Sequence, residues 1–338
     1  MPYDELNATT ALKQSIPLEP LFVDYLIVTL NVVCGEVISV IGIVANGVSI
    51  AVFCKLGFHD SVDVTLTALA ISDIGSLVSL QFYNIMVNPW MSSAQLPFEP
   101  PDATILFSVY PHIYFIRVTG LITAFAALER CVCVVLPLKV KDIFTCKRAM
   151  LIILILFLIS ISNVIAPYYY FRFGWILSPE RNSSILRIIP KKNWYFGIGL
   201  SYMFNDIFIQ YLTFAVLIAC TVITSVTLHR NATWKKSISK GGYRKVENKV
   251  SLKEIKVVKM LYFVSVTFIV CLLPLSTTLT AVGVVEDLSL NGAYYQVARL
   301  CYCVSFTMET VSSSMNAFIY YSMSSKYKRA FMTLFVTE

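Results

Sequence analysis

The chain has 338 residues, of which 57% are hydrophobic and only 14% are charged. A soluble globular domain carries about 25% charged residues, so this composition excludes that class of protein. The formal net charge of +7 lies mostly in short segments between apolar blocks, where contact with anionic lipid explains it and no nucleic-acid partner is needed.

Long apolar blocks recur along the whole chain. A helix needs roughly 20 apolar residues to cross about 30 Å of hydrocarbon in a bilayer, and the blocks have this length. They predict an all-α fold, a seven-transmembrane helix bundle with a short amphipathic C-terminal helix. The predicted transmembrane helices cover residues 28–55, 62–88, 103–137, 147–170, 197–228, 255–284 and 293–323.

The blocks divide the chain into three parts. We expect an N-terminal segment over residues 1–27, a seven-helix domain over 28–323, and a C-terminal helix and tail over 324–338. The N-terminal segment lacks the basic start and short apolar run of a cleavable signal peptide, so the first helix is expected to direct its own insertion. In the C-terminal part, basic residues alternate with aromatic and aliphatic ones, which is typical of a helix lying on the membrane surface.

The distribution of lysine and arginine predicts which end of the bundle faces the cytoplasm. A dense run of both lies between residues 230 and 259, and further basic residues follow predicted helices one, three and seven. Because cytoplasmic loops carry the excess of positive charge, we expect an extracellular N-terminus and a cytoplasmic C-terminus in the plasma membrane. Two sequons on the extracellular side, at Asn7 and Asn182, are then candidates for glycosylation.

Polar and ionisable side chains recur inside the predicted helices. Burying such a group in hydrocarbon costs free energy, so each one is a candidate for function. Hydrogen bonding within the bundle explains any one of them alone, whereas their order and depth together indicate a shared site. They are Asn46, Asp73, Thr119, the pair Glu129 and Arg130, and Asn316.

Short motifs in successive predicted helices surround these residues. They are Gly42–Asn46, Leu69–Asp73, Glu129–Cys131 with Pro137–Leu138, Phe268–Pro274, and Asn316–Tyr320 with Lys326–Arg329. Together they resemble the rhodopsin-like, or class A, family of G-protein-coupled receptors, and the resemblance extends over essentially the whole chain. It implies a receptor that binds an extracellular ligand and activates a heterotrimeric G protein in the cytoplasm.

The resemblance implies an activation switch at the cytoplasmic end. Arg130 pairs with the neighbouring Glu129, and Glu254 at the start of helix six is placed to pair with Arg130 across the bundle. Ligand binding would swing helix six outward about Pro274 and free the arginine, as a population shift between two packings. The residues implied in this switch are Glu129, Arg130, Glu254, Phe268, Pro274, Asn316 and Tyr320.

The resemblance also implies a cation site in the middle of the bundle. In this family such a polar pocket holds an allosteric sodium ion in the inactive state, and oxygen ligands suit a hard cation. Its residues here would be Asp73, Thr119, Ser312 and Asn316. We expect no other cofactor.

The sequence departs from the family pattern at its extracellular end. The family ties the start of helix three to the next extracellular loop by a disulfide, but Ile105 occupies one position and residues 168–195 contain no cysteine. We therefore predict no structural disulfide and a loop that is less constrained than is typical. Leu272 replaces the tryptophan before the helix-six proline, and Ala317 replaces the helix-seven proline, so the aromatic switch and the helix kink are altered.

Two positions in the upper bundle exclude whole classes of ligand. His112 lies where amine receptors have aspartate, and Thr310 lies where opsins have the retinal lysine. Arg117 is an unusual charge for its depth, with Asp206 and Glu309 as candidate partners. It forms either a buried ion pair that fixes helix packing or an anchor for an acidic group on the ligand. The predicted ligand site consists of His112, Ile113, Ile116, Arg117, Asp206, Tyr302, Phe306 and Glu309.

The kind of ligand stays open between a peptide and a chemosensory small molecule. The end of helix seven, residues 314–327, resembles invertebrate receptors, molluscan ones in particular, that are described as neuropeptide-like or chemosensory. Aromatic and amide side chains around the expected pocket suit both classes. The ligand's identity, the G-protein coupling class and the oligomeric state are also open.

A transporter or channel is the main alternative function. It predicts inverted repeats or helices broken at mid-membrane, and the sequence shows neither. An enzyme would need a catalytic motif, but His59, His112 and His229 are scattered and have no accompanying nucleophile or metal motif. We therefore expect a receptor, with a ligand, a G protein and membrane lipids as its partners.

Overall fold

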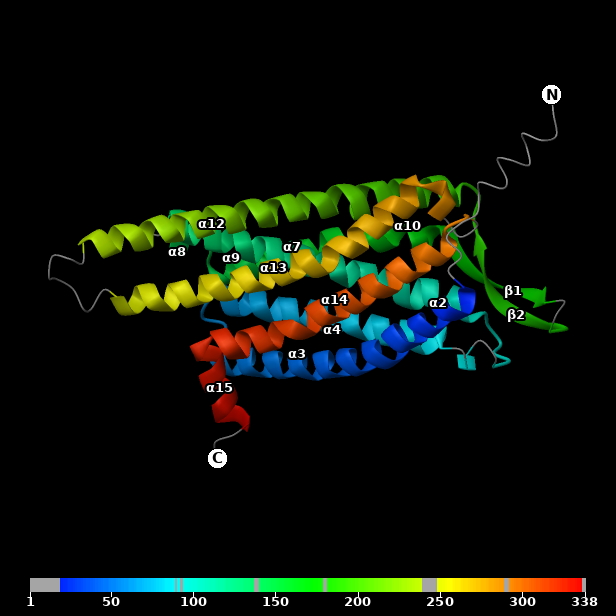
Figure 1. The fold of residues 1–338 in the computed structure, drawn as a ribbon, viewed down its shortest axis with the longest axis horizontal. Helices are drawn as coiled ribbons and strands as arrows, with labels where there is room; N and C mark the ends of the chain where they lie inside the picture. The colour runs from blue at the N-terminus through cyan, green and yellow to red at the C-terminus, as the bar shows by residue number, and fades with distance from the viewer. Residues whose placement is uncertain are drawn as a thin grey trace, which may run out of the picture.

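The computed structural model describes residues 19–88, 90–91, 94–136, 140–178, 181–238, 248–288 and 292–335. Within this part of the chain, seven long helical segments lie side by side along the longest axis (Figure 1). A hairpin of β1 (Phe171–Ser178) and β2 (Ser183–Pro190) stands at one end, and the short helix α15 (Ser325–Phe335) crosses the bundle at the other. We refer to these as the hairpin end and the α15 end.

The seven segments combine α-helices with three π-helical stretches. Membrane helices tolerate such local changes because neighbouring helices and side chains satisfy the freed backbone groups. In chain order the segments are α2 (Pro20–Ile27), η1 (Val28–Gly35) and α3 (Glu36–Leu56); α4 (Ser61–Val87); α6 (Pro100–Thr104), η2 (Ile105–Val109) and α7 (Tyr110–Val135); α9 (Cys146–Ser160) and α10 (Ser162–Tyr170); α11 (Trp194–Tyr202), η3 (Met203–Ile209) and α12 (Gln210–Ile238); α13 (Asn248–Val284); and α14 (Tyr295–Met323). Two short elements, α8 (Val140–Ile143) and η5 (Glu286–Leu288), lie in the connections.

By length and composition alone, six of the described segments are apolar enough to cross a membrane. The exception is α14, whose 29 residues are long enough but whose inner face is polar. This helix packs against α13, α3 and α4, and it buries Glu309, Ser312 and Asn316. Its polarity therefore follows from its contacts within the bundle, and the predicted seven-helix bundle with a C-terminal helix is confirmed.

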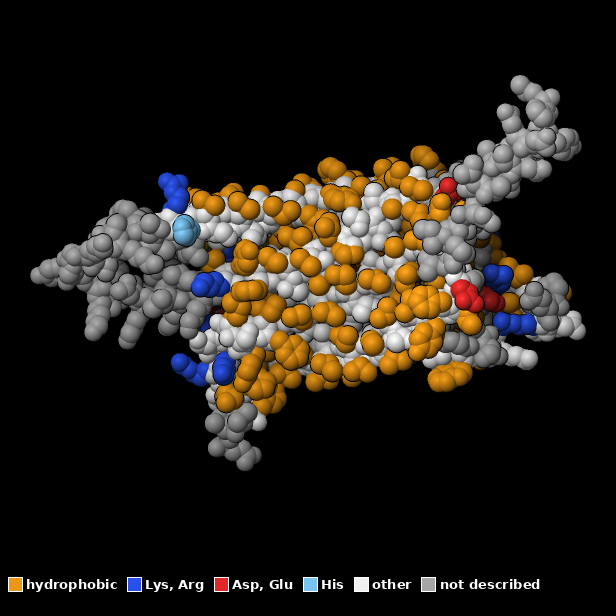
Figure 2. All heavy atoms as spheres, in the orientation of Figure 1, with side chains coloured by type: hydrophobic (Ala, Val, Ile, Leu, Met, Phe, Trp, Pro, Cys, Tyr) orange, Lys and Arg blue, Asp and Glu red, His pale blue; other side chains and the backbone are white. Residues whose placement is uncertain are grey.

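The outer surface of the bundle is apolar. Figure 2 shows hydrophobic side chains over the middle of the visible face and charged side chains at the two ends. Leu151, Ile155 and Phe208 are examples of large apolar side chains that are exposed. Because water disfavours so large an apolar surface, the arrangement is that of a multi-pass membrane protein.

Several helices begin or end outside the predicted limits. The first segment begins at Pro20 rather than at residue 28, because a proline in the first helical turn lacks only an N–H that would have no helical partner. The third segment begins at Pro100 for the same reason. The fifth continues to Ile238, since the apolar pattern marks only the membrane-crossing part of a helix.

The hairpin between α10 and α11 is an element that the apolar blocks do not predict. Its strands pair antiparallel, from Phe171 with Pro190 to Ser178 with Ser183. Phenylalanine, tryptophan and isoleucine in both strands favour extended backbone. Residues 179–182 between them lack the Asn-Gly or Asp-Gly signal of a tight hairpin turn, so the sequence indicates only a loop.

The hairpin is fastened to the segment before α7 without a disulfide. All nine cysteines are free. Leu186 donates its backbone N–H to the carbonyl oxygen of Pro97 at 2.8 Å. The Asp102 carboxylate accepts from Arg187 Nε at 3.2 Å and from the backbone N–H of Ile188 at 2.9 Å. Backbone pairing and an ion pair therefore connect this loop to the bundle, and its lower constraint relative to disulfide-linked loops stays a prediction.

Candidate functional site

A cavity of about 520 Å³ lies near the hairpin end, between the first, second, third, sixth and seventh segments. Its volume falls within the range of about 300–1,000 Å³ that is usual for ligand pockets. We call it the hairpin-end cavity. It is lined mainly by aliphatic and aromatic side chains: Ile27, Asn31, Tyr83, Val87, Ile105, Val109, Ile113, Leu275, Leu279, Val282, Leu288, Tyr295, Ala298, Arg299, Tyr302, Cys303 and Phe306.

Arg299 is the charged side chain among the described residues that line this cavity. Its guanidinium donates to the Asp24 carboxylate at 2.7 Å and to Gln296 Oε1 at 3.0 Å. The Asp24 side chain is 54% exposed, so solvent screens this ion pair and another anion can compete for Arg299. The cavity therefore combines an apolar interior with a partly exposed cation.

Three of the predicted ligand residues, Ile113, Tyr302 and Phe306, line the hairpin-end cavity. The rings of Tyr302 and Phe306 are stacked with centroids 6.2 Å apart, and Phe306 meets the His112 ring edge-on at 5.6 Å. Aromatic side chains provide a large apolar contact area with few rotamers. Through Phe306, the cavity wall thus contacts polar residues deeper in the bundle.

His112 and Glu309 form a buried contact between α7 and α14. His112 Nε2 lies 3.0 Å from the Glu309 carboxylate, and both residues are at most 1% exposed. His112 Nδ1 lies 3.2 Å from both the side-chain hydroxyl and the backbone oxygen of Ser76. Glu309 is therefore engaged by His112.

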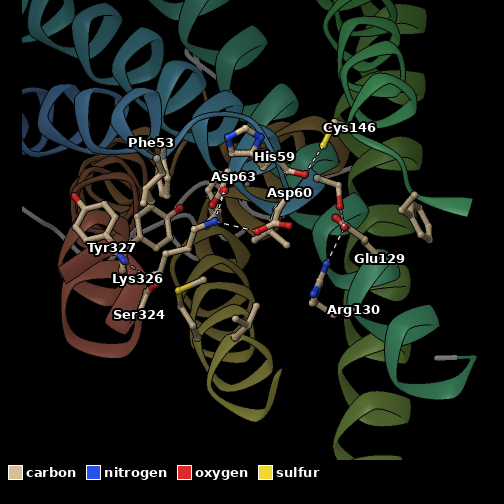
Figure 3. A pocket seen from close by; sticks show the side chains of 18 of the residues that line it. Phe53, His59, Asp60, Asp63, Glu129, Arg130, Cys146, Ser324, Lys326 and Tyr327 are labelled. Atoms are coloured by element: carbon tan, nitrogen blue, oxygen red, sulfur yellow. Dashed lines mark hydrogen bonds and ion pairs between the residues drawn. The ribbon is translucent and has the colours of Figure 1, made fainter. Parts of the chain in front are cut away.

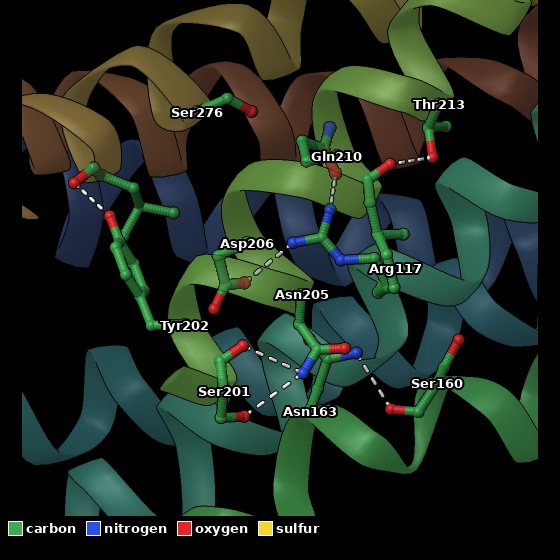
Figure 4. Close-up of polar contacts among 12 residues, drawn as sticks. Arg117, Ser160, Asn163, Ser201, Tyr202, Asn205, Asp206, Gln210, Thr213 and Ser276 are labelled. Carbon is green, nitrogen blue, oxygen red and sulfur yellow. Dashed lines mark hydrogen bonds and ion pairs between the residues drawn. The ribbon is translucent and has the colours of Figure 1, made fainter. Parts of the chain in front are cut away.

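Arg117 pairs with Asp206, one of its two predicted partners. Nη2 donates to Asp206 Oδ1 at 2.8 Å, and Nη1 donates to the side-chain oxygen of Gln210 (Figure 4). Gln210 follows Asp206 by about one helical turn, so both face α7 from the same side of their segment. These residues, with His112 and Ile116, line a second cavity of about 20 Å³, which we call the small cavity.

The middle of the bundle holds a buried polar cluster around Asp73. Asn316 donates to Asp73 Oδ2 at 2.7 Å, and Thr119 donates to Oδ1 at 3.2 Å. Ser312 is buried on the same helix as Asn316. The structure thus brings together Asp73, Thr119 and Asn316 from three helices.

The donor set of this cluster fits a hard cation. A carboxylate, a hydroxyl and an amide supply the oxygen atoms that such ions prefer. Asn46 donates to the backbone oxygen of Ser313 at 2.8 Å, and its own side-chain oxygen is buried without a hydrogen-bond partner. Within the described ranges, no group of three or more His, Cys, Asp or Glu side chains is arranged to hold a metal ion. A cation here would therefore rest on Asp73 and neutral oxygen atoms.

A third cavity, of about 650 Å³, lies at the α15 end, and we call it the α15-end cavity (Figure 3). Arg130 Nη2 donates to Glu129 Oε1 at 2.7 Å, and Ser61 donates to the same carboxylate oxygen. Glu129 is 1% exposed, so this contact lies at the inner wall of the cavity. The side chain of Glu254 lies outside the described residues, and its pairing with Arg130 stays a prediction.

Lys326 fastens α15 to the beginning of α4. Its Nζ lies 2.9 Å from the Asp60 carboxylate and 2.6 Å from that of Asp63. Partial burial by itself would lower the pKa of Lys326, but the hydrogen bonds and charges of Asp63 and Asp60 outweigh it and raise the pKa above its usual value. Lys326 therefore stays protonated at neutral pH, and the contact stays ionic.

Phe268 and Tyr320, two residues of the predicted switch, are both buried. Phe268 packs on Phe214 with ring centroids 6.3 Å apart and stands over Gly120, where an added Cβ would meet Phe268 Cζ at 2.9 Å. The Tyr320 hydroxyl has no hydrogen-bond partner among the described residues. A buried polar group without a partner costs free energy, which a different packing of the same helices can recover.

The chain matches the family model described as 7 transmembrane receptor (rhodopsin family) over residues 45–320. It belongs to this family. Lysophosphatidic acid receptor 4 of Homo sapiens is 19% identical, over 89% of this chain and 76% of the relative, and its Mus musculus counterpart is 18% identical over the same shares. Lysophosphatidic acid receptor 6 of Gallus gallus is 21% identical, over 85% of this chain and 87% of the relative.

The receptor function predicted from the motifs is confirmed by this match: the chain is a G-protein-coupled receptor that transduces ligand binding. The match does not favour the alternative of a transporter or channel. The narrower resemblance to molluscan neuropeptide-like or chemosensory receptors is not confirmed, because these relatives are vertebrate receptors named for a lipid.

Seven of the eight predicted ligand residues line the hairpin-end cavity or the small cavity, with Ile113 in both, whereas Glu309 lines neither. Sequence reasoning misses Arg299 and Gln210. Arg299 reads as one of several basic residues on the extracellular side, because its inward direction depends on the rotation of α14. Gln210 has a sequence signal, namely its spacing of one helical turn after Asp206.

Proposed function

We propose that the receptor binds an anionic amphiphile in the hairpin-end cavity, with the apolar chain inside and the charged head beside Arg299. The observation that carries this proposal is the make-up of the cavity wall, which is aliphatic and aromatic with one charged residue among those described. Apolar burial contributes about 25 cal/mol per Å². Lysophosphatidic acid, for which the relatives are named, is a ligand of this chemistry.

Arg299 is suited to hold the head group. A guanidinium forms strong, often bidentate, hydrogen bonds with phosphate or carboxylate. Its present partner Asp24 is more than half exposed, so an arriving head group can replace that carboxylate while Asp24 turns to water. The exchange leaves Arg299 paired at every stage, which keeps the electrostatic cost of binding low.

The hairpin end is the extracellular end in this proposal, and the α15 end lies in the cytoplasm beneath the plasma membrane. In support, α12 ends and α13 begins at the α15 end (Figure 1), and the sequence between residues 230 and 259 is rich in Lys and Arg, as the positive-inside rule expects of a cytoplasmic segment. Asn182, a predicted glycosylation site, is exposed in the turn between β1 and β2. Asn7 lies outside the described residues.

Ligand binding would reach the middle of the bundle along α14. Phe306 contacts both the hairpin-end cavity and His112. Glu309, the partner of His112, lies one helical turn further on, and Asn316 follows about two turns later and holds Asp73. A ligand that displaces Phe306 would therefore strain the contact between α7 and α14 and shift the balance between two packings.

The α15 end would respond to that shift by changing ion-pair partners. Movement of α13 about Pro274 would separate Arg130 from the predicted partner Glu254 and open the α15-end cavity to a heterotrimeric G protein. Tyr320 would then find a partner for its free hydroxyl. Sodium bound at Asp73 would supply a positive charge that stabilises the closed packing.

Nucleotide exchange in membranes that contain the receptor tests the proposal. We expect 1-oleoyl lysophosphatidic acid to stimulate exchange on added G protein, and monooleoylglycerol, which lacks the phosphate, to be much weaker. Arg299→Gln should raise the half-maximal concentration of the phosphate-bearing probe by roughly 10-fold to 100-fold, as expected for a lost hydrogen bond to a charged group.

Arg172→Gln is the matched control, because Arg172 is exposed on β1 at the same end and does not line the cavity. Equal stimulation by the two probes, or an unchanged response of Arg299→Gln, would contradict the proposed head-group site. A response to peptides with none to either lipid would favour the peptide ligand considered from the sequence.

A further inference from the structure

Two buried N–H groups at the small cavity have no partner. Arg117 Nε and Gln210 Nε2 make no hydrogen bond in the described structure, and the two residues are only 4% and 2% exposed. An unpaired buried donor costs free energy, and native proteins seldom retain one without a reason. Both side chains line the small cavity, which offers space beside them for a hydrogen-bond acceptor.

The small cavity adjoins the hairpin-end cavity. Ile113, Leu275 and Leu279 line both of them. These aliphatic side chains have several staggered rotamers, so they can part without breaking a side-chain hydrogen bond. A ligand chain in the larger cavity can therefore extend into the smaller one.

The volume of the small cavity limits what can enter. About 20 Å³ is available, and a single water molecule needs roughly 10–15 Å³ by this kind of measure. One hydroxyl, carbonyl or ether oxygen fits this space. A phosphate or carboxylate, with several oxygen atoms on one centre, does not.

The ionisable groups around the small cavity already have partners. Arg117 is paired with Asp206 at 2.8 Å, with side-chain exposures of 5% and 13%, and His112 is paired with Glu309 at 3.0 Å. An additional anion would be a buried charge without a counter-charge, which is strongly unfavourable. Neutral acceptors therefore suit the two free N–H groups better than an additional anion does.

We infer that the small cavity is a subsite for one uncharged oxygen atom on the tail of the ligand, which accepts hydrogen bonds from Arg117 Nε and Gln210 Nε2. The inference rests on the proposed function and narrows its ligand class. The ligand is an anionic amphiphile whose tail carries a hydroxyl, keto or ether oxygen. Arg299 holds the charged head, and the small cavity recognises the oxygen on the tail.

The position of that oxygen along the tail follows from the helix geometry. Phe306, which contacts the small-cavity residue His112, lies seven residues after Arg299 on α14. Seven residues of helix rise about 10 Å. The oxygen must therefore be far from the head group, and an oxygen next to the head serves as a positional control.

Binding of three probes to the purified full-length receptor, measured by the shift in its unfolding temperature, tests the inference. The probes are dodecanoic acid, 12-hydroxydodecanoic acid and 2-hydroxydodecanoic acid. We expect the 12-hydroxy compound to bind about threefold to tenfold more tightly than the other two, which is the usual gain from a net hydrogen bond.

Ser276→Val provides the variant test. Ser276 is buried, lines the small cavity and donates only to its own helix at Leu272, so valine fills space without touching either ion pair. The variant should lose the preference for the 12-hydroxy probe and keep its affinity for dodecanoic acid. Thr277→Val is the matched control, since Thr277 is exposed and donates within α13 in the same way.

The results distinguish failure of the tail-oxygen subsite from failure of the proposed ligand class. Equal binding of the three probes, or a preference that survives Ser276→Val, overturns the inference and leaves the head-group site intact. A water molecule that occupies the small cavity permanently would give that result. Failure of all three probes to bind overturns the proposed ligand class and the inference with it.

Discussion

The hairpin end and the α15 end each hold a large cavity, but the two are built from different interactions. The hairpin-end cavity is walled by apolar side chains with Arg299 as the charged residue described, whereas the α15-end cavity contains charged groups that pair with one another. Apolar walls bind by burial, which depends on area more than on direction. Ion pairs have defined partners and can exchange them. An apolar cavity wall therefore suits ligand binding, and a set of ion pairs suits switching.

The polar contacts between each cavity and the middle of the bundle also differ at the two ends. Beneath the hairpin-end cavity lie two buried contacts, the Arg117–Asp206 ion pair and the contact of His112 with Glu309. Above the α15-end cavity lies the hydrogen-bonded contact of Asn316 with Asp73. Substitutions in the two cavities and in the contacts between them should therefore affect stability or signalling to different degrees.

The largest effect is expected at the α15 end. Arg130→Gln removes the charge that pairs with Glu129, and we predict that it abolishes ligand-stimulated nucleotide exchange. Surface expression should be retained, because the side chain of Arg130 is partly exposed and lies at the edge of the bundle. Exchange measured against cell-surface antibody binding checks this, and undiminished exchange would contradict the assigned switch.

The next effect is on stability beneath the hairpin-end cavity. Asp206→Ala leaves Arg117 as a buried charge without a counter-charge and should lower the free energy of unfolding by about 3–5 kcal/mol. Arg117→Met combined with Asp206→Leu should recover most of this loss, because the unpaired charge is gone. Thermal unfolding of the purified variants measures both. A stable Asp206→Ala variant would show that the pair is not buried in the working receptor.

A smaller effect is expected in the fastening of the hairpin. Asp102→Ala removes the acceptor for Arg187 and for the backbone N–H of Ile188. Because Arg187 is about half exposed, we expect a loss of only about 1 kcal/mol in local stability. Hydrogen exchange of residues 183–190 should become faster, with the rest of the bundle unchanged. Arg172→Gln, on the exposed side of β1, should leave exchange as it is.

The smallest effect tests the predicted partner of Arg130. Glu254→Ala should raise ligand-independent nucleotide exchange by roughly twofold to fivefold, the range expected for the loss of one weak ion pair. The reason is that the closed packing loses one stabilising contact and the open one loses none. Basal exchange equal to that of the wild type would remove Glu254 from the switch.

The helices of the bundle can be predicted from the sequence because each must bury its own backbone hydrogen bonds in hydrocarbon. Because of this requirement, the apolar blocks are easy to recognise in the sequence. Helix ends are not, as at Pro20, where the helix continues into a polar environment. The hairpin cannot be predicted in the same way. Its pairing of Phe171 with Pro190 joins residues that carry no turn signal between them.

The candidate site shows the same division between local and long-range information. Asp73 and Asn316 can be singled out from the sequence because polar groups at membrane depth are costly. The choice of Asp206 over Glu309 as the partner of Arg117 depends on how each helix is rotated about its axis, which residue spacing does not determine. For the same reason, the sequence does not show that the side chain of Arg299 points into the bundle.

The way in which the hairpin is held has a practical consequence. Backbone hydrogen bonds at Leu186 and the carboxylate of Asp102 fasten it, and every cysteine is a free thiol. The hairpin therefore needs no oxidising compartment to form. Dithiothreitol should leave the ligand affinity of the receptor unchanged, so binding can be assayed in reductant.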